Sequence, residues 1–145
     1  MQTTTLDHVP FSIFIGKWEG FSKTYDVAGN FLESTAVHMD IAWCGENRFR
    51  QIEHIHNLYQ VGEVRLVSEI AVTDKTAFAE TAHLHLQATE LTPTTFVFRV
   101  KSAASGTTLH NTHYFIDANT RRVITHKFKN GETFVFQVQD FARIE

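Results

Sequence analysis

The stretch Phe14-Ile15-Gly16-Lys17-Trp18-Glu19-Gly20 decides how the rest of the chain is interpreted. It places a Trp two residues after a Gly, where a short apolar run gives way to alternating residues. Successive side chains of a β-strand point to opposite faces of a sheet. One face of this segment carries Trp18, Gly20, Ser22 and Thr24, and the other carries Lys17, Glu19 and Lys23. The stretch therefore predicts a strand that turns its charges to solvent and its indole inward.

The same period of two continues along the chain and predicts about nine strands. Their expected ranges are 16–25, 31–43, 48–59, 63–72, 76–88, 96–101, 107–116, 122–129 and 133–142. Short turns separate them, and Asn130-Gly131 between two Phe-containing segments is the clearest hairpin signal. Before the first strand, Asp7 and Pro10 fit a brief helical turn, because Asp caps helices and Pro suits a first turn. The pattern is typical of an all-β, antiparallel fold.

The Gly16-x-Trp18 motif resembles the opening of lipocalins and their calycin relatives. Sandwich, barrel and open sheet all fit these strands, and the resemblance favours the barrel, as does the protection of strand edges by closure. It implies one β-barrel domain over residues 1–145, antiparallel and 8–10-stranded, with a short N-terminal helical turn at one end. It also implies that Trp18 plugs that end and that a basic residue of the last strand, Arg143 here, covers the indole.

Composition excludes several classes of partner. The net charge is −3 with no basic block, so neither nucleic acid nor an anionic membrane surface is an expected partner. No run approaches the about 18 apolar residues that a membrane-spanning helix needs. A single Cys, Cys44, cannot form an internal disulfide, and the first residues lack the charged and apolar regions of a signal peptide. The expected location is the cytoplasm.

The segment 48–59 does not have a consistently apolar face. One face carries Phe49, Gln51, Glu53, Ile55, Asn57 and Tyr59, and the other carries Arg48, Arg50, Ile52, His54, His56 and Leu58. Whichever face is inside, polar groups enter the barrel and need partners there, since an unpaired buried polar group costs ~1–3 kcal/mol. The alternative is that the polar set is simply the solvent face, and the pattern leaves the choice open.

An apolar wall that faces a polar patch is typical of a small-molecule pocket. We therefore expect the protein to bind a small, largely hydrophobic molecule inside the barrel. The candidate ligand-binding residues come from the segments 48–59, 96–101 and 107–116, and they are Arg50, His54, His56, Phe98, His113 and Tyr114.

A small cofactor-free isomerase, cyclase or lyase that uses a His in the same cavity is the alternative. Glu53 with His113, or His54 with Tyr114, are the acid–base pairs that the sequence offers, because His titrates near neutrality. Cys44 has no assignable base, and no phosphate-binding or dinucleotide motif is present in the sequence.

The nine His also raise the question of metal binding. His54-x-His56 and His83-x-His85 each place two imidazoles on one strand face, about 7 Å apart. Gln60 stands where a carboxylate would follow the first pair, and the second pair alternates with Ala and Leu residues that are expected to face inward, which leaves these two His in solvent. Neither a metal nor another cofactor is therefore expected. Phe21 and Tyr25 lie on the face opposite Trp18, where exposed aromatics would pair two barrels, and a homodimer is a further expectation.

Overall fold

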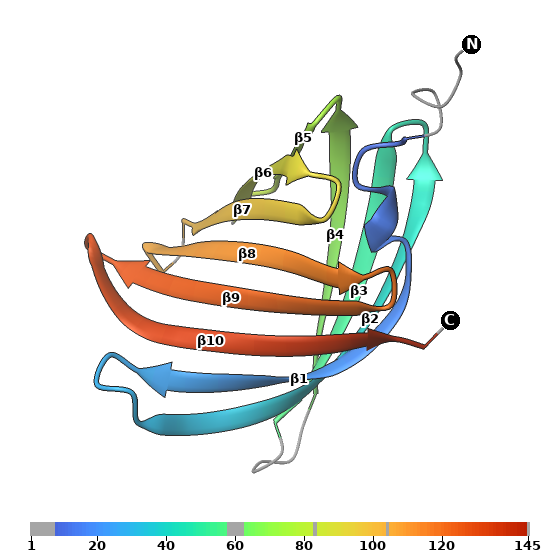
Figure 1. Cartoon of the computed structure of the whole chain (residues 1–145). Helices are drawn as coiled ribbons and strands as arrows, with labels where there is room; N and C mark the ends of the chain where they lie inside the picture. The colour runs from blue at the N-terminus through green and yellow to red at the C-terminus, as the bar shows by residue number, and fades with distance from the viewer. Residues whose placement is uncertain (1–7, 58–62, 83, 104, 145) are drawn as a thin grey trace.

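The computed structural model describes residues 8–57, 63–82, 84–103 and 105–144, which form one short 3-10 turn and ten strands (Figure 1). The turn is η2 (Ser12–Phe14). The first five strands are β1 (Gly16–Asp26), β2 (Phe31–Gly45), β3 (Arg48–Asn57), β4 (Glu63–Thr73) and β5 (Thr76–Glu80). The others are β6 (Leu84–Thr92), β7 (Thr95–Ser102), β8 (Thr107–Asp117), β9 (Thr120–Lys129) and β10 (Glu132–Arg143).

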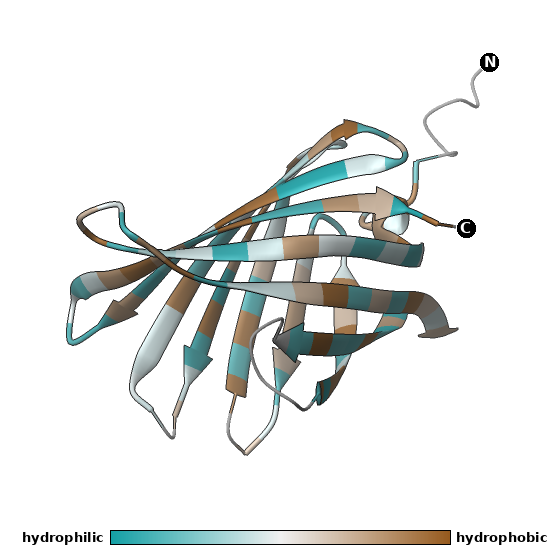
Figure 2. Ribbon diagram, turned by 90° about the horizontal axis from the view of Figure 1, so that it is seen from below, coloured by the Kyte–Doolittle hydropathy of each residue, from teal (hydrophilic) through white to brown (hydrophobic). Residues whose placement is uncertain are grey.

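The ten strands close into one barrel. Each strand pairs antiparallel with its sequence neighbours, and β1 pairs with both β2 and β10, which joins the two ends of the sheet. Hydrophobic and hydrophilic residues alternate along the strands, as the period of two predicts (Figure 2). The expectation of a single antiparallel barrel of 8–10 strands is confirmed.

The predicted strand 76–88 is wrong in one respect, because it is two strands. Thr81 N–H donates to Leu84 O at 2.8 Å, and Leu84 N–H donates to Thr81 Oγ1 at 3.1 Å, which reverses the chain between β5 and β6. Neither Gly nor Pro marks this turn, and the alternating pattern continues through it. β6 then runs on to Thr92, beyond the predicted end of this strand at residue 88.

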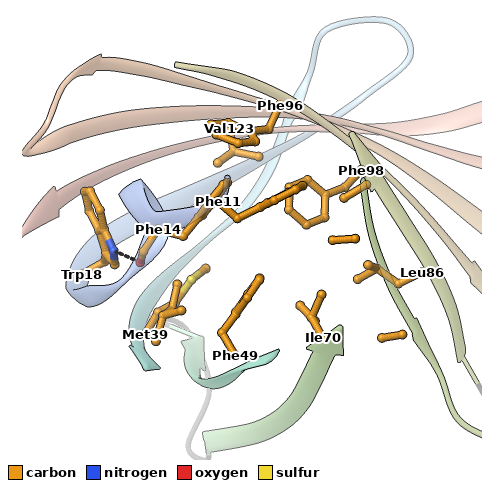
Figure 3. Close-up of a cluster of buried hydrophobic side chains, with 14 of the residues drawn as sticks. Phe11, Phe14, Trp18, Met39, Phe49, Ile70, Leu86, Phe96, Phe98 and Val123 are labelled. Atoms are coloured by element: carbon orange, nitrogen blue, oxygen red, sulfur yellow. Dashed lines mark hydrogen bonds between the residues drawn. The ribbon is translucent and has the colours of Figure 1, made fainter. Parts of the chain in front are cut away.

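The N-terminal turn plugs one end of the barrel. Phe11 and Phe14 are buried at 0% and 2% exposure, and they lie at the centre of a ring of apolar side chains (Figure 3). Trp18 is also fully buried, and its Nε1–H donates to Phe14 O at 2.9 Å. The predicted inward face of the first strand is confirmed, since Ser22 and Thr24 are buried as well.

Arg143 fastens this plug to the barrel. Its guanidinium lies 4.3 Å from the Trp18 ring, so the predicted cation–π contact is confirmed. The same group donates from Nη2 to Ile13 O at 2.8 Å and from Nε to Ala118 O at 3.1 Å. It also donates from Nη1 to Ile15 O. One side chain of the last strand therefore holds the N-terminal turn, the first strand and the β8–β9 turn together.

Gly20 lies where β1 meets β10. A Cβ at this position would lie 1.9 Å from Asp140 O, in the backbone of β10. The glycine therefore allows β1 and β10 to approach each other where the barrel closes. Within the described residues, no helix has the length and apolarity that crossing a membrane requires.

Trp18→Ala should lower the free energy of unfolding by ~3–5 kcal/mol, because it removes the largest fully buried side chain and leaves a cavity. Urea melts measure this loss. Trp43→Ala is the matched control, since Trp43 is 39% exposed and its loss should cost far less. Combining Trp18→Ala with Arg143→Ala should give a coupling of ~0.5 kcal/mol or more, because touching residues are not additive. Strict additivity, or equal losses from the two Trp variants, would contradict the plug.

Candidate functional site

The end of the barrel opposite the plug is open and hollow. A cavity of about 420 Å³ lies there, where the β1–β2 and β9–β10 hairpins and the β7–β8 turn meet. Thr24, Leu109, Lys127 and Gln137 are among the side chains that line it. A second cavity of about 450 Å³ borders it, because both are lined by Ser102 and Thr107. A ligand can therefore enter the barrel from this end.

The barrel interior is not filled by its own side chains. Leu66 and Val64 of β4 pair with Glu53 and Ile55 on the face that carries the buried Phe49 and Ile70. They point inward, yet they remain 47% and 54% exposed. The neighbouring strands β5 and β6 contribute small buried side chains, Ala77, Ala79 and Ala88. A ligand inside the barrel would cover this exposed apolar surface.

The structure decides which face of β3 is inside. Phe49 is 1% exposed, so Gln51, Glu53 and Ile55 share its inward face. Arg50, His54 and His56 lie on the outer wall. There Arg50 Nη2 contacts Glu69 Oε2 at 3.0 Å, and His54 Nδ1 contacts Glu63 Oε1 at 3.0 Å.

Two of the six predicted site residues meet inside the barrel. His113 is 9% exposed and Phe98 is 8% exposed, and their ring centroids are 4.6 Å apart. Tyr114 follows His113 in β8 and is 44% exposed on the outer wall. The structure therefore brings His113 and Phe98 together and places Arg50, His54, His56 and Tyr114 outside the interior.

Arg121 of β9 forms the floor of the hollow, and the sequence analysis missed it. Its guanidinium lies between aromatic rings, 5.1 Å from Phe14, 4.7 Å from Trp18, 4.9 Å from Phe141 and 5.5 Å from Phe115. Burial lowers its pKa to about 9, so it stays protonated at neutral pH. Nη2–H donates to Met39 Sδ at 3.6 Å, whereas Nε and Nη1 have no hydrogen-bond partner among the described residues.

Glu53 and His113 both face the interior, and both feel the charge of Arg121. Burial raises the pKa of Glu53, although a hydrogen bond from Gln51 Nε2 at 3.4 Å and the charge of Arg121 oppose the rise. Burial and then the charge of Arg121 lower the pKa of His113 well below its usual range, so the imidazole is neutral at neutral pH. His113 Nδ1 and Ser22 Oγ also have no hydrogen-bond partner within the described chain. The inner part of the barrel thus contains buried polar atoms without a hydrogen-bond partner in the described chain.

A polar strip connects this floor with the mouth. Thr125 Oγ1–H donates to Asn111 Oδ1 at 2.7 Å, and Gln137 Nε2–H donates to Thr24 Oγ1 at 3.1 Å. Nearer the mouth, burial lowers the pKa of Lys127, against the opposing charge of Glu33. The facing wall is apolar and includes Ile70, Leu86 and Val100. This arrangement can orient an amphipathic molecule, with its apolar part on one wall and its polar part along the other.

The described residues contain no group of three or more His, Cys, Asp or Glu side chains that could hold a metal ion. His83 lies outside the described residues, and its expected partner His85 is ion-paired with Glu80 at 3.1 Å.

A signal for Arg121 existed in the sequence, since it lies two residues before Val123 in a strand of period two. It was obscured because the predicted strand began at Arg122.

A pH dependence of stability follows from the burial of His113. The unfolded chain takes up a proton near the ordinary pKa of 6.5, whereas the folded protein does so only well below it. Below pH ~6.5 the unfolded chain binds more protons, so the free energy of unfolding falls as pH falls, by up to ~1.4 kcal/mol per pH unit. Urea melts at pH 7.5 and 5.5 should show that His113→Gln removes this part of the slope. His54→Gln, on the outer wall, should keep it. An identical slope in both variants would contradict the assignment to His113.

No known protein-family model and no curated protein sequence matches the chain. Several solved structures are similar to this chain. The S-type phycobiliprotein lyase CpeS from Guillardia theta superposes with a TM-score of 0.75 at 11% identity, over 93% of this chain and 90% of that one. A protein of unknown function from the DUF3598 family of Nostoc punctiforme gives a TM-score of 0.75 at 13% identity, over 98% of this chain.

This chain spans only 52% of the Nostoc protein. The protein EF1p2_mFAP2b bound to DFHBI is similar with a TM-score of 0.50 at 9% identity, over 90% of this chain and 94% of that one. These likenesses concern the fold alone, a closed antiparallel β-barrel.

Proposed function

We propose that this protein binds a small, largely hydrophobic molecule inside the barrel, with a polar group of that molecule directed toward the floor. One observation carries the proposal: Leu66 and Val64 face the interior and remain about half exposed. Inward apolar side chains of a barrel are normally covered, and covering them here is favourable at roughly 25 cal/mol per Å² of apolar area. The cavity of about 420 Å³ at the mouth, lined by Thr24, Leu109 and Lys127 among others, falls in the range that small-molecule pockets occupy.

The polar end of the ligand is defined by the atoms that lack partners. Ser22 Oγ and His113 Nδ1 lie in one cross-strand row of inward residues, and Arg121 lies one row closer to the plug. A buried polar atom without a partner costs ~1–3 kcal/mol, so a hydrogen-bonding group on the ligand would recover part of that cost. Of the predicted binding residues, the proposal keeps His113 as a polar contact and Phe98 as an apolar one.

Catalysis in the barrel interior is the second candidate function, and the positions of Glu53 and His113 favour it. Both face the interior, and both have pKa values shifted toward the neutral form by burial. A carboxyl with a raised pKa and a neutral imidazole can exchange a proton with a bound carbonyl compound at neutral pH. Arg121 supplies a fixed positive charge beside them, which would stabilise an oxyanion.

Binding can be tested with the neutral hydrophobic dye Nile red. The protein should enhance its fluorescence saturably, and Leu66→Trp should weaken that binding at least tenfold because the indole fills the hollow. Val67→Trp is the matched control, since the adjacent side chain points outward and is 48% exposed. Its affinity should stay within about twofold of the original. Equal effects of the two variants, or no saturable binding at all, would place the apolar site elsewhere.

Catalysis is distinguished from binding by the fate of a ligand that copurifies with the protein. In the enzyme reading, incubation of extracted ligand with fresh protein changes its mass or its chromatographic retention. Glu53→Gln should abolish that change while leaving copurification intact, because the amide keeps the size of the side chain and loses its proton exchange. Ligand recovered unaltered from the original protein and from the variant alike supports binding alone.

Two sequence-based predictions belong to this proposal as well. Phe21 lies on the outer wall and is 56% exposed, as a surface that pairs two barrels requires. The homodimer and the cytoplasmic location are part of what we propose, on the composition and surface features given above.

A further inference from the structure

The outer wall carries a row of four polar side chains across four strands, three of which are basic. Gln87 of β6 pairs with Arg99 of β7, Arg99 with His110 of β8, and His110 with His126 of β9. Residues paired in this way point to the same face with Cβ atoms about 5 Å apart. Because the inward residues of these strands alternate with them, the row faces away from the barrel interior.

This row lies in a groove of about 450 Å³. The polar side chains along it are Gln87, Thr89, Arg99, His110, Thr112 and His126. None of the residues that line the groove, all within the described part of the chain, carries a carboxylate. On a protein of net charge −3, a groove with three basic groups and no acid is unusual.

Several other basic side chains of the outer wall contact a carboxylate. Arg50 contacts Glu69 at 3.0 Å, and Arg122 contacts Asp140 at 2.8 Å. His54 and His85 likewise each contact a glutamate. In the groove, by contrast, the basic groups face one another. Partial burial lowers the pKa of His110, and the charges of Arg99 and His126 lower it further.

Aromatic rings hold the two imidazoles in place. The His110 ring centroid lies 4.8 Å from that of Phe128, and the His126 centroid lies 5.0 Å from that of Phe136. Such contacts restrict the imidazoles before any ligand arrives, which reduces the entropy lost on binding. The groove therefore presents oriented donors rather than freely moving charges.

We propose that this groove binds the phosphate or sulfate group of a small molecule, at a site separate from the barrel interior. The guanidinium of Arg99 can donate two parallel hydrogen bonds to a tetrahedral oxyanion. His110 and His126 supply further charge when protonated, and the Thr89 and Thr112 hydroxyls and the Gln87 amide supply neutral donors. A tetrahedral dianion offers more acceptor oxygens than a carboxylate and matches this number of donors better. Its charge also removes the repulsion between the basic groups.

Inorganic sulfate is the probe for the experiment, because it remains a dianion between pH 5.5 and 8. Histidine-resolved NMR should show saturable shifts of the His110 and His126 ring signals, beyond those caused by chloride at equal ionic strength. Arg99→Ala should weaken sulfate binding at least tenfold, since it removes the bidentate donor. Arg122→Ala is the matched control, because that arginine is already paired with Asp140 on the same wall, and its affinity should stay within about twofold.

Lowering the pH should strengthen binding, because sulfate favours the protonated imidazoles. The charged and titratable groups that face His110 are Arg99 and Lys101 on β7 and His126 on β9, and all are cationic or become so. Inorganic phosphate should compete with sulfate. Sedimentation with phosphatidylcholine vesicles, with and without phosphatidic acid, distinguishes a lipid headgroup from a soluble ligand as the source of the phosphate. Shifts equal to those of chloride, or equal losses in the two Arg variants, would overturn the proposal.

Discussion

The contact between Trp18 and Arg143 is the constraint on which the rest of the structure depends. These residues lie at opposite ends of the chain, and they are paired where β1 meets β10 and the barrel closes. The guanidinium covers the indole and binds the carbonyls of Ile13 and Ile15, so closure of the sheet and docking of the N-terminal turn occur together. The backbone contact at Gly20 belongs to the same closure. With this end fixed by packing, a ligand of the barrel interior would enter from the other end.

The two ends of the barrel therefore have different physical characters. At the plug, aromatic rings and two arginines fill the space, and the cations are stabilised by ring faces and carbonyl oxygens. Toward the mouth, side chains that point inward keep part of their surface uncovered. Between the two ends, polar atoms of Ser22 and His113 are buried without a hydrogen-bond partner in the described chain, which lowers the stability of the empty protein. A fold selected only for stability would have apolar residues at these positions, so their presence argues for a ligand.

Sequence reasoning recovered the features that local pattern determines. Trp18, the inward face of its strand and the all-β barrel follow from alternation and one motif. The break between β5 and β6 did not, because Thr81 closes that turn with its hydroxyl and no Gly or Pro marks it. The inward face of β3 stayed undecided, since both of its faces mix apolar and charged residues. Arg121 was missed because the predicted strand began at Arg122 and left out the first two residues of β9. Tertiary packing settles these points, and alternation alone cannot.

His110 and His113 show how strongly the position in the barrel determines chemistry. They are three residues apart on β8 and point to opposite faces. His113 packs against Phe98 and Phe14 inside the barrel. Burial there makes the charged form costly, so the ring is neutral, with one nitrogen that can donate a hydrogen bond and one that can accept. His110 lies in a groove with Arg99 and His126, where an arriving anion would make the charged form favourable. The same side chain can thus serve an apolar interior site and an anionic outer one, because the strand separates the two environments by the thickness of a single sheet.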